Sequence, residues 1–200
     1  MKYAIGIDLG TTNTEMAYCR LDGEGGSTTF DVPQFVAPSV IESRFRLPSF
    51  LYIGSEEERV SSSWKLPWDE DDDFDPVSSK SSPARDEKSG KKGFLERAFG
   101  LGTIFKKKLP EGLSNPNALY LVGEIASSRI VTEPERTVAS AKSWLTATRV
   151  DRRSPILPWN SPDGCDKVSP VEASRRYLSH LVAAWNNSYP DAPIPSNSLC

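Results

Sequence analysis

The sequence predicts a mixed α/β fold, with short strands near the N-terminus and an amphipathic helix near the C-terminus. In residues 3–9 apolar and small residues alternate, as in a strand with one face toward a core. Tyr3, Ile5, Ile7 and Leu9 share one face of that strand, and Ala4, Gly6 and Asp8 share the other. The later stretch "KVSPVEASRRYLSHLVAAW" carries a helix start signal and apolar residues at helical spacing.

Residues 1–53 read as the β-rich first part of the fold. Strand patterns cover residues 3–9 and 14–20, and after the turn "DGEGGS" two shorter apolar pieces cover 30–36 and 49–53. Short strands separated by turn residues predict hairpins.

Residues 54–117 differ from the rest in composition. They contain the acidic run "DEDDDFD", the polar tract "SSKSSPARDEKSGKK" and the basic, apolar stretch "FLERAFGLGTIFKKK". Such mixed charge with Ser, Pro and Gly buries too little apolar area to offset the entropy of ordering, so we expect a long disordered insertion. Its basic, apolar part also has the composition of a short amphipathic helix for a membrane surface or a partner.

Residues 118–192 return to an ordered pattern, followed by a tail at 193–200. Two amphipathic helices are predicted here. In "VTEPERTVASAKSWL", Thr132 and Glu135 form the pattern of a capping box, with Pro134 in the first turn. Ser169, Pro170 and Glu172 repeat the pattern before the second helix, and its apolar face is expected to comprise Val171, Leu178, Leu181, Val182 and Trp185.

The composition argues against several classes of protein. The 24 basic and 27 acidic residues give a net charge of -3, so no global basic field favours nucleic acid. Cys19, Cys165 and Cys200 are far apart and show no CxxC spacing, which disfavours a disulfide framework or a zinc site. No leader pattern opens the sequence, and no apolar run approaches the roughly 20 residues of a membrane helix. We therefore expect a cytoplasmic protein without an integral membrane segment.

The single histidine and the first cysteine have ordinary interpretations. His180 is expected at the surface or rim of the second helix, because no Ser, Cys or metal ligand is spaced to use it. Cys19 falls in a strand pattern and is expected to be a small core residue.

The turn after the first strand carries the chemistry. Gly10, Thr11 and Thr12 offer successive backbone N–H groups and two hydroxyls, which suit phosphate oxygens. Asp8 would repel a bare phosphate, but a water-held Mg²⁺ between them makes the carboxylate useful. The pattern thus favours Mg·nucleotide, although these residues alone also fit a polar hairpin turn capped by threonine side chains.

Several stretches resemble one ATPase superfamily. "IGIDLGTTNTEMAY" resembles the first phosphate loop of the actin, sugar-kinase and heat-shock-chaperone ATPases. "YLVGEIASSRIVTEPERTVASAKSWL" is similar to a stretch of the heat shock protein 70 family, and "RLPSFLYI" resembles the strand of that family that carries "TPS". "DRRSPILPW" and "KVSPVEASRRYLSHLVAAWN" are similar to a bacterial branch of heat shock protein 70-like proteins. The resemblance covers residues 1–53 and 119–192 and implies the first lobe of a ribonuclease H-like, actin-like ATPase.

The resemblance assigns roles to individual residues. It implies that Asp8 holds the water shell of Mg²⁺ and that Gly10, Thr11, Thr12 and Asn13 bind the phosphates of ATP. It makes Thr11 the residue nearest the γ-phosphate. Lys142 aligns with the catalytic lysine, which orients the attacking water and stabilises the transferring phosphoryl charge. The spacing of Lys142 alone also fits a lysine whose stem covers apolar surface.

The expected function is that of an ATP-binding, chaperone-like protein. Its partners would be the nucleotide and, through domains that this chain lacks, unfolded clients or co-chaperones. The sequence contains neither a second "DxGxGT" phosphate loop nor a "GGxxR" adenosine loop, so we expect an incomplete lobe, a fragment that does not hydrolyse ATP alone. The alternative is a non-catalytic binding module that uses residues 54–117. A sugar kinase is disfavoured, because "VGEIA" and "AK" fit the chaperone pattern better.

Overall fold

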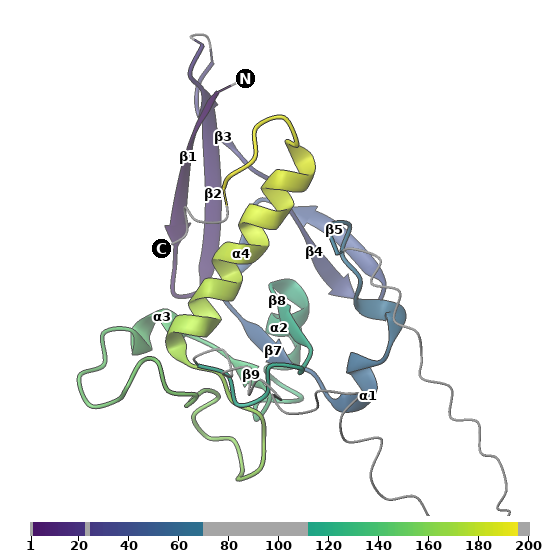
Figure 1. Ribbon diagram of the computed structural model, residues 1–200, viewed down its shortest axis with the longest axis vertical. Coiled ribbons are helices and arrows are strands. Elements are labelled where there is room, and N and C mark those ends of the chain that lie inside the picture. Colours follow the sequence, from purple (N-terminus) through teal and green to yellow (C-terminus); the bar gives the residue numbers. More distant parts are fainter. Residues whose placement is uncertain (1, 23–24, 70–111, 196–200) are drawn as a thin grey trace, which may run out of the picture. The chain divides into compact units, whose positions relative to one another are not determined.

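The computed structural model describes residues 2–22, 25–69 and 112–195 (Figure 1). The strands are β1 (Tyr3–Leu9), β2 (Asn13–Arg20), β3 (Thr28–Thr29), β4 (Val32–Ala37), β5 (Val40–Arg44), β6 (Leu47–Pro48), β7 (Leu51–Ile53), β8 (Tyr120–Val122) and β9 (Thr137–Val138). The helices are α1 (Glu56–Arg59), α2 (Glu124–Arg129), α3 (Ala141–Trp144), α4 (Pro170–Ser188) and the 3-10 helix η1 (Ser62–Trp64). The mixed α/β class is therefore confirmed, in the form of small antiparallel sheets with few helices.

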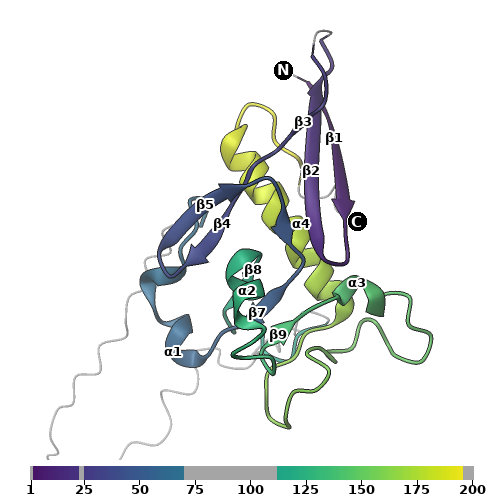
Figure 2. The same cartoon turned by 180° about the vertical axis from the view of Figure 1, so that it is seen from behind.

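Three small sheets make up the β-structure of the described residues. One has the order β1-β2-β3, with β6 also paired to β2, the second is the β4-β5 hairpin, and the third has the order β8-β7-β9 (Figure 2). The alternation predicted for the first strand is confirmed, since its odd-numbered residues are half-buried and its even-numbered ones exposed. Strand β1 therefore presents Asp8 on its open face.

Helix α4 begins as the sequence predicts. The Ser169 hydroxyl accepts a hydrogen bond from the Glu172 N–H at 3.0 Å, and Pro170 occupies the first turn, where a missing N–H costs little. The predicted apolar face is only partly right, because Val171 is exposed and Leu178 is half-buried.

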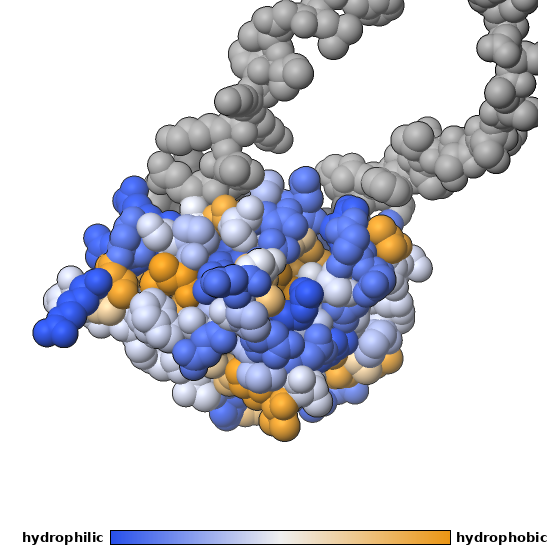
Figure 3. Space-filling model, turned by 90° about the horizontal axis from the view of Figure 1, so that it is seen from below, coloured by the Kyte–Doolittle hydropathy of each residue, from blue (hydrophilic) through white to orange (hydrophobic). Residues whose placement is uncertain are grey.

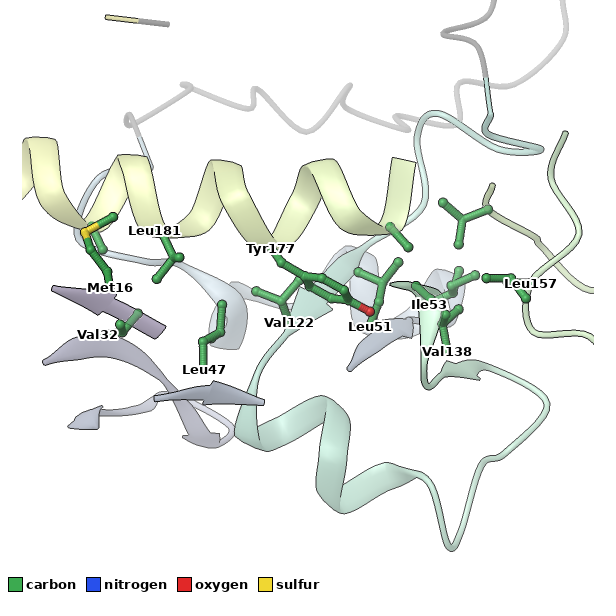
Figure 4. Packing of buried hydrophobic residues seen from close by; sticks show 14 of the residues in the cluster. Met16, Val32, Leu47, Leu51, Ile53, Val122, Val138, Leu157, Tyr177 and Leu181 are labelled. Carbon is green, nitrogen blue, oxygen red and sulfur yellow. The ribbon is translucent and has the colours of Figure 1, made fainter. Parts of the chain in front are cut away.

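The main core lies between α4 and the strands. In Figure 4, Tyr177 and Leu181 point from α4 toward Met16, Leu47 and Val122, which come from β2, β6 and β8. Each of these five side chains is at most 9% exposed. Side chains of α4 thus connect strands from distant parts of the sequence.

An aromatic cluster attaches the first hairpin to the end of α4. Trp185 is fully buried, contacts Tyr3 and Tyr18 edge-on and stacks on Tyr189 at a centroid distance of 4.1 Å. Its indole N–H also donates to the Ala192 carbonyl at 2.9 Å, so the ring is both packed and hydrogen-bonded.

The helix predicted over "VTEPERTVASAKSWL" is wrong for most of its length. The stretch forms turns, then β9, and only its end is the short helix α3. Thr137 pairs with Tyr52 and Val138 pairs with Leu51, and both residues of β9 are buried. Pairing with a buried strand therefore outweighs the local helix start signal.

The predicted insertion is folded at both ends. Residues 54–69 contain α1 and η1, and Ser55 forms a capping box with Glu58 at the start of α1. At the other end the backbone of Leu113 bridges to Val168. The disordered segment was thus predicted too wide, and residues 70–111 lie outside the described residues.

A charged cluster ties α1 to β7 and α2. The Tyr52 hydroxyl lies 2.7 Å from a Glu58 carboxylate oxygen and 2.6 Å from one of Glu133, and Arg129 lies 3.0 Å from Glu58. Burial and the two carboxylates raise the pKa of Tyr52. Burial opposes ionisation of Glu58, but the Ser55 N–H, Tyr52 and Arg129 outweigh it and lower the pKa of its carboxyl. The cluster explains why the predicted insertion begins as folded structure.

His180 is not a surface residue. It is 9% exposed, its ring packs edge-on against Trp68, and its Nε2 lies 2.8 Å from the Pro33 carbonyl oxygen. Because a carbonyl only accepts, Nε2 carries the proton of the neutral ring. Burial lowers the pKa of His180 from 6.5 to about 4, despite that bond and the nearby Asp69 carboxylate. The sequence pattern missed this because both neighbours come from distant segments.

The surface of the described residues is mixed. Figure 3 shows hydrophobic residues in several small groups among polar ones on the face seen from below. Within residues 2–22, 25–69 and 112–195, no helix has the length and apolar character needed to cross a membrane. Cys19 is half-buried, so it does not belong to the fully buried core.

Candidate functional site

The predicted phosphate loop comprises the connection between β1 and β2 and the first residue of β2, and we call these residues, 10–13, the Gly10 loop. Thr11 and Thr12 are exposed at its tip. A Cβ atom at Gly10 would lie 2.0 Å from the Asn13 carbonyl oxygen, so the chain closes here only with glycine.

Ser49 fixes the loop from one side. Its hydroxyl donates to the Gly10 carbonyl at 2.9 Å, and its N–H donates to the Thr12 carbonyl at 2.8 Å. Because the proton of the Ser49 hydroxyl is used in this way, the buried Thr14 hydroxyl donates to Ser49 Oγ at 2.9 Å. No pattern in the sequence points to a role for Ser49, although it lies in the "LPS" of "RLPSFLYI".

The N–H groups of the loop remain available. Among the residues that the structure describes, the backbone N–H groups of Thr11 and Thr12 have no hydrogen-bond acceptor. Two consecutive, exposed donors in a short loop suit phosphate oxygens, because such an anion accepts from several donors at once. The Gly10 and Thr12 carbonyls, which would repel an anion, are held by Ser49.

Asp8 lies beside the loop on the open face of the hairpin. Its residue is exposed, and its register partner on β2 is Glu15. A depression of about 340 Å³ covers this face, lined by Asp8 and Glu15 and by small residues such as Gly6 and Ala17. Arg46 pairs with Glu15 at 3.9 Å, so of the two carboxylates on this face Asp8 is the one with no ion pair among the described residues.

The donor set suits Mg²⁺ bound through water. No group of three potential metal ligands occurs in the described part of the chain. A magnesium ion that keeps most of its waters needs only one or two protein carboxylates together with phosphate oxygens. The exposed Asp8 carboxylate suits the waters of the metal ion, and the free N–H groups of the loop suit the phosphate oxygens. The site therefore has groups for both parts of Mg·phosphate.

Lys142 is exposed and is the second residue of α3. In the antiparallel pair of β7 and β9, Val138 lies opposite Leu51. The chain that follows Val138 leads to α3, and the chain that precedes Leu51 contains Ser49. Because the strands are antiparallel, both segments leave the pair at the same end. Ser49 is hydrogen-bonded to the Gly10 loop. In the projection of Figures 1 and 2, α3 is drawn beside the end of the β1–β2 hairpin. The structure thus brings Asp8 and the loop residues together, whereas no described contact joins Lys142 to them.

Comparison with known proteins gives no independent assignment. No protein-family model matches the sequence, and no curated protein matches it.

Proposed function

We propose that the chain binds Mg·ATP at the Gly10 loop, as an ATP-binding, chaperone-like protein of the heat shock protein 70 type. The observation that carries the proposal is the pair of free N–H groups at Thr11 and Thr12, in a loop whose Gly10 and Thr12 carbonyls are held by Ser49. The resemblance of the sequence supports the same site. The proposal includes the actin-like ATPase lobe as the finer fold class, a cytoplasmic location, and clients or co-chaperones as partners of a longer assembly.

Each residue has a role in this proposal. The N–H groups of Thr11 and Thr12 donate to phosphate oxygens, and the Thr11 hydroxyl lies nearest the terminal phosphate. Gly10 lets the phosphate approach the backbone, and Asn13 closes the loop. Asp8 accepts from the waters of the metal ion, and Mg²⁺, when bound, neutralises phosphate charge.

Lys142 supplies the positive charge in this proposal. As an exposed ammonium near the start of α3, it would attract the terminal phosphate and orient a water for attack. The antiparallel register of β7 and β9 supports this role, because it directs the start of α3 toward the end of the sheet where Ser49 holds the Gly10 loop.

The expected affinity is weak. Because Thr11 and Thr12 are exposed, the phosphates would stay largely in contact with water. We expect a Kd of about 1 mM, near -4 kcal/mol. Hydrolysis needs a site that excludes water and surrounds the transferring phosphoryl group, so we expect binding without appreciable turnover by these residues alone.

The test is a calorimetric titration with Mg·ATP of the full chain and its variants. Asp8→Asn and Lys142→Ala should each weaken binding, and removal of Mg²⁺ with a chelator should weaken wild-type binding as Asp8→Asn does. Asp31→Asn is the matched control, because Asp31 is also exposed but lies outside the loop. Binding that is indifferent to Asp8 and Lys142 would refute the proposal.

The alternative function, a binding module that uses residues 54–117, stays a hypothesis. Most of that segment lies outside the described residues, and its folded ends, 54–69 and 112–117, are used in internal packing.

A further inference from the structure

A second depression shares no lining residue with the Gly10 loop and has opposite chemistry. It encloses about 630 Å³ and is lined mainly by apolar side chains, which include Trp144, Trp159, Pro158 and Val138. A volume of this size suits a small organic molecule. We call it the Trp pocket.

The walls of the Trp pocket are fixed by the fold. Leu157, which precedes Pro158, exchanges two backbone hydrogen bonds with Val168 at 2.9 and 2.8 Å, directly before α4. Val138 belongs to the buried pair of β9 with β7. The Ser161 hydroxyl connects the two sides, since it lies within hydrogen-bond distance of the Glu135 and Pro158 carbonyl oxygens.

Two indole rings form the aromatic surface of the pocket. Trp144 and Trp159 stack with a centroid distance of 4.9 Å and an interplanar angle of 26°. Trp159 is nevertheless 53% exposed, which is high for the largest apolar side chain. The stacked pair therefore keeps aromatic surface available to a ligand.

Glu135 sets the charge of the pocket. It is the one ionisable residue among the described lining residues, and they include neither Lys nor Arg. Its carboxylate makes no ion pair and no side-chain hydrogen bond with any described residue. Glu135 and the two tryptophans line the same depression, and a carboxylate together with ring faces, which carry a negative quadrupole, attracts a cation. The neighbouring Arg136 donates instead to the Ile53 carbonyl at 3.3 Å.

From this arrangement we propose that the Trp pocket binds an organic ammonium ion, such as a quaternary trimethylammonium group, with its methyl groups on the indoles and its charge facing Glu135. A trimethylammonium group fits better than a metal ion, because its charge lies inside an apolar shell that matches the apolar walls. It also fits better than a neutral apolar molecule, which would leave the Glu135 carboxylate without a counter-charge.

The test uses choline and its neutral carbon analogue, 3,3-dimethylbutan-1-ol, as probes of the full chain. Calorimetry should give millimolar binding of choline and at least about fivefold weaker binding of the neutral analogue. NMR spectra should show choline shifting the indole N–H signals of Trp144 and Trp159 and leaving that of Trp185 in place.

Variants separate charge from packing. Glu135→Gln and Trp159→Leu should each weaken choline binding about fivefold, while Glu57→Gln, a change of an exposed carboxylate elsewhere, should not. Circular dichroism shows whether each variant is folded, and both sites of change lie at the pocket surface. Equal binding of choline and its neutral analogue, or choline binding unchanged in Glu135→Gln, would overturn the proposal. A trimethyllysine peptide that binds while choline does not would also overturn it, because a peptide site would then be required.

Discussion

The Gly10 loop and the Trp pocket differ in what the chain offers to a ligand. The loop offers the backbone N–H groups of the exposed Thr11 and Thr12, which have no acceptor among the described residues, while Ser49 holds the Gly10 and Thr12 carbonyls. The pocket offers side chains, namely two indole rings and the Glu135 carboxylate. Backbone donors suit an anion and aromatic faces suit a cation, so one small protein would select ligands of opposite charge at its two sites.

Both regions depend on the same strand. Ser49, which holds the Gly10 loop, precedes β7 by two residues in the sequence. Val138, which lines the Trp pocket, pairs with Leu51 of β7. Changes in β7 should therefore affect both sites together, whereas changes at either rim should separate them.

The largest expected effect is that of Leu51→Ala. Leu51 is fully buried and pairs with both Val122 and Val138. Its truncation leaves a cavity in the centre of the third sheet, and we expect a loss of about 2–5 kcal/mol in the free energy of unfolding. Urea unfolding followed by circular dichroism measures this loss, and Leu51→Val should cost clearly less. A variant as stable as wild type would mean that β7 does not support the two sites.

The next largest effect is a loss of stability in acid that acts on both sites at once. The pKa of His180 is lowered from 6.5 to about 4 in the folded state, so the unfolded chain binds the proton more tightly. The contribution of the neutral His180 to the free energy of unfolding is therefore complete above pH 6.5. It is lost as the pH falls toward 4, and the loss is at most about 3 kcal/mol.

The matched variant for this effect is His180→Gln, whose neutral amide can still donate to the Pro33 carbonyl. Urea midpoints of both proteins, measured between pH 7 and pH 4, should converge as the wild type loses its advantage. Parallel pH curves for the two proteins would rule out His180 as the cause.

A smaller effect on stability should separate the two sites. Gly10→Ala places a Cβ against the Asn13 carbonyl oxygen, and we expect a loss of about 1–3 kcal/mol as the loop rearranges. Mg·ATP binding should disappear, while choline binding at the Trp pocket should stay at the wild-type value. Gly26→Ala is the control, because a Cβ there meets no atom within 4 Å and Gly26 lines neither site. Loss of choline binding in Gly10→Ala would show that the sites are not independent.

The sequence predicted the elements whose periodicity is long and unambiguous. Strand β1 and helix α4 follow from alternation and from a cap followed by a repeated apolar face. The segment around Pro134 carries a similar cap signal but forms β9 instead, because Thr137 and Val138 have buried partners in β7. Local start signals are therefore reliable only where no strand competes for the same residues.

Only the part of the candidate site that is formed by residues close in sequence could be predicted. Asp8 and the Gly10 loop are contiguous in sequence, so their grouping on one hairpin follows from the strand pattern. The role of Ser49 depends on contacts with Gly10 and Thr14, which lie 39 and 35 residues away in sequence and carry no local signal. Likewise, the burial of His180 depends on Pro33, at a separation of 147 residues. The role of Lys142 stays a prediction.

The most direct measurement of the central claim is a titration of the isotope-labelled full chain with Mg·ATP, followed through the backbone amide signals. If the Gly10 loop binds the phosphates through its free N–H groups, the Thr11 and Thr12 amide signals should shift most, with saturation near millimolar concentration. The same signals should stay in place in Asp8→Asn, and the Trp159 indole signal should not move in either protein. Shifts that centre on the Trp pocket, or a saturating titration that leaves Thr11 and Thr12 unmoved, would contradict the account.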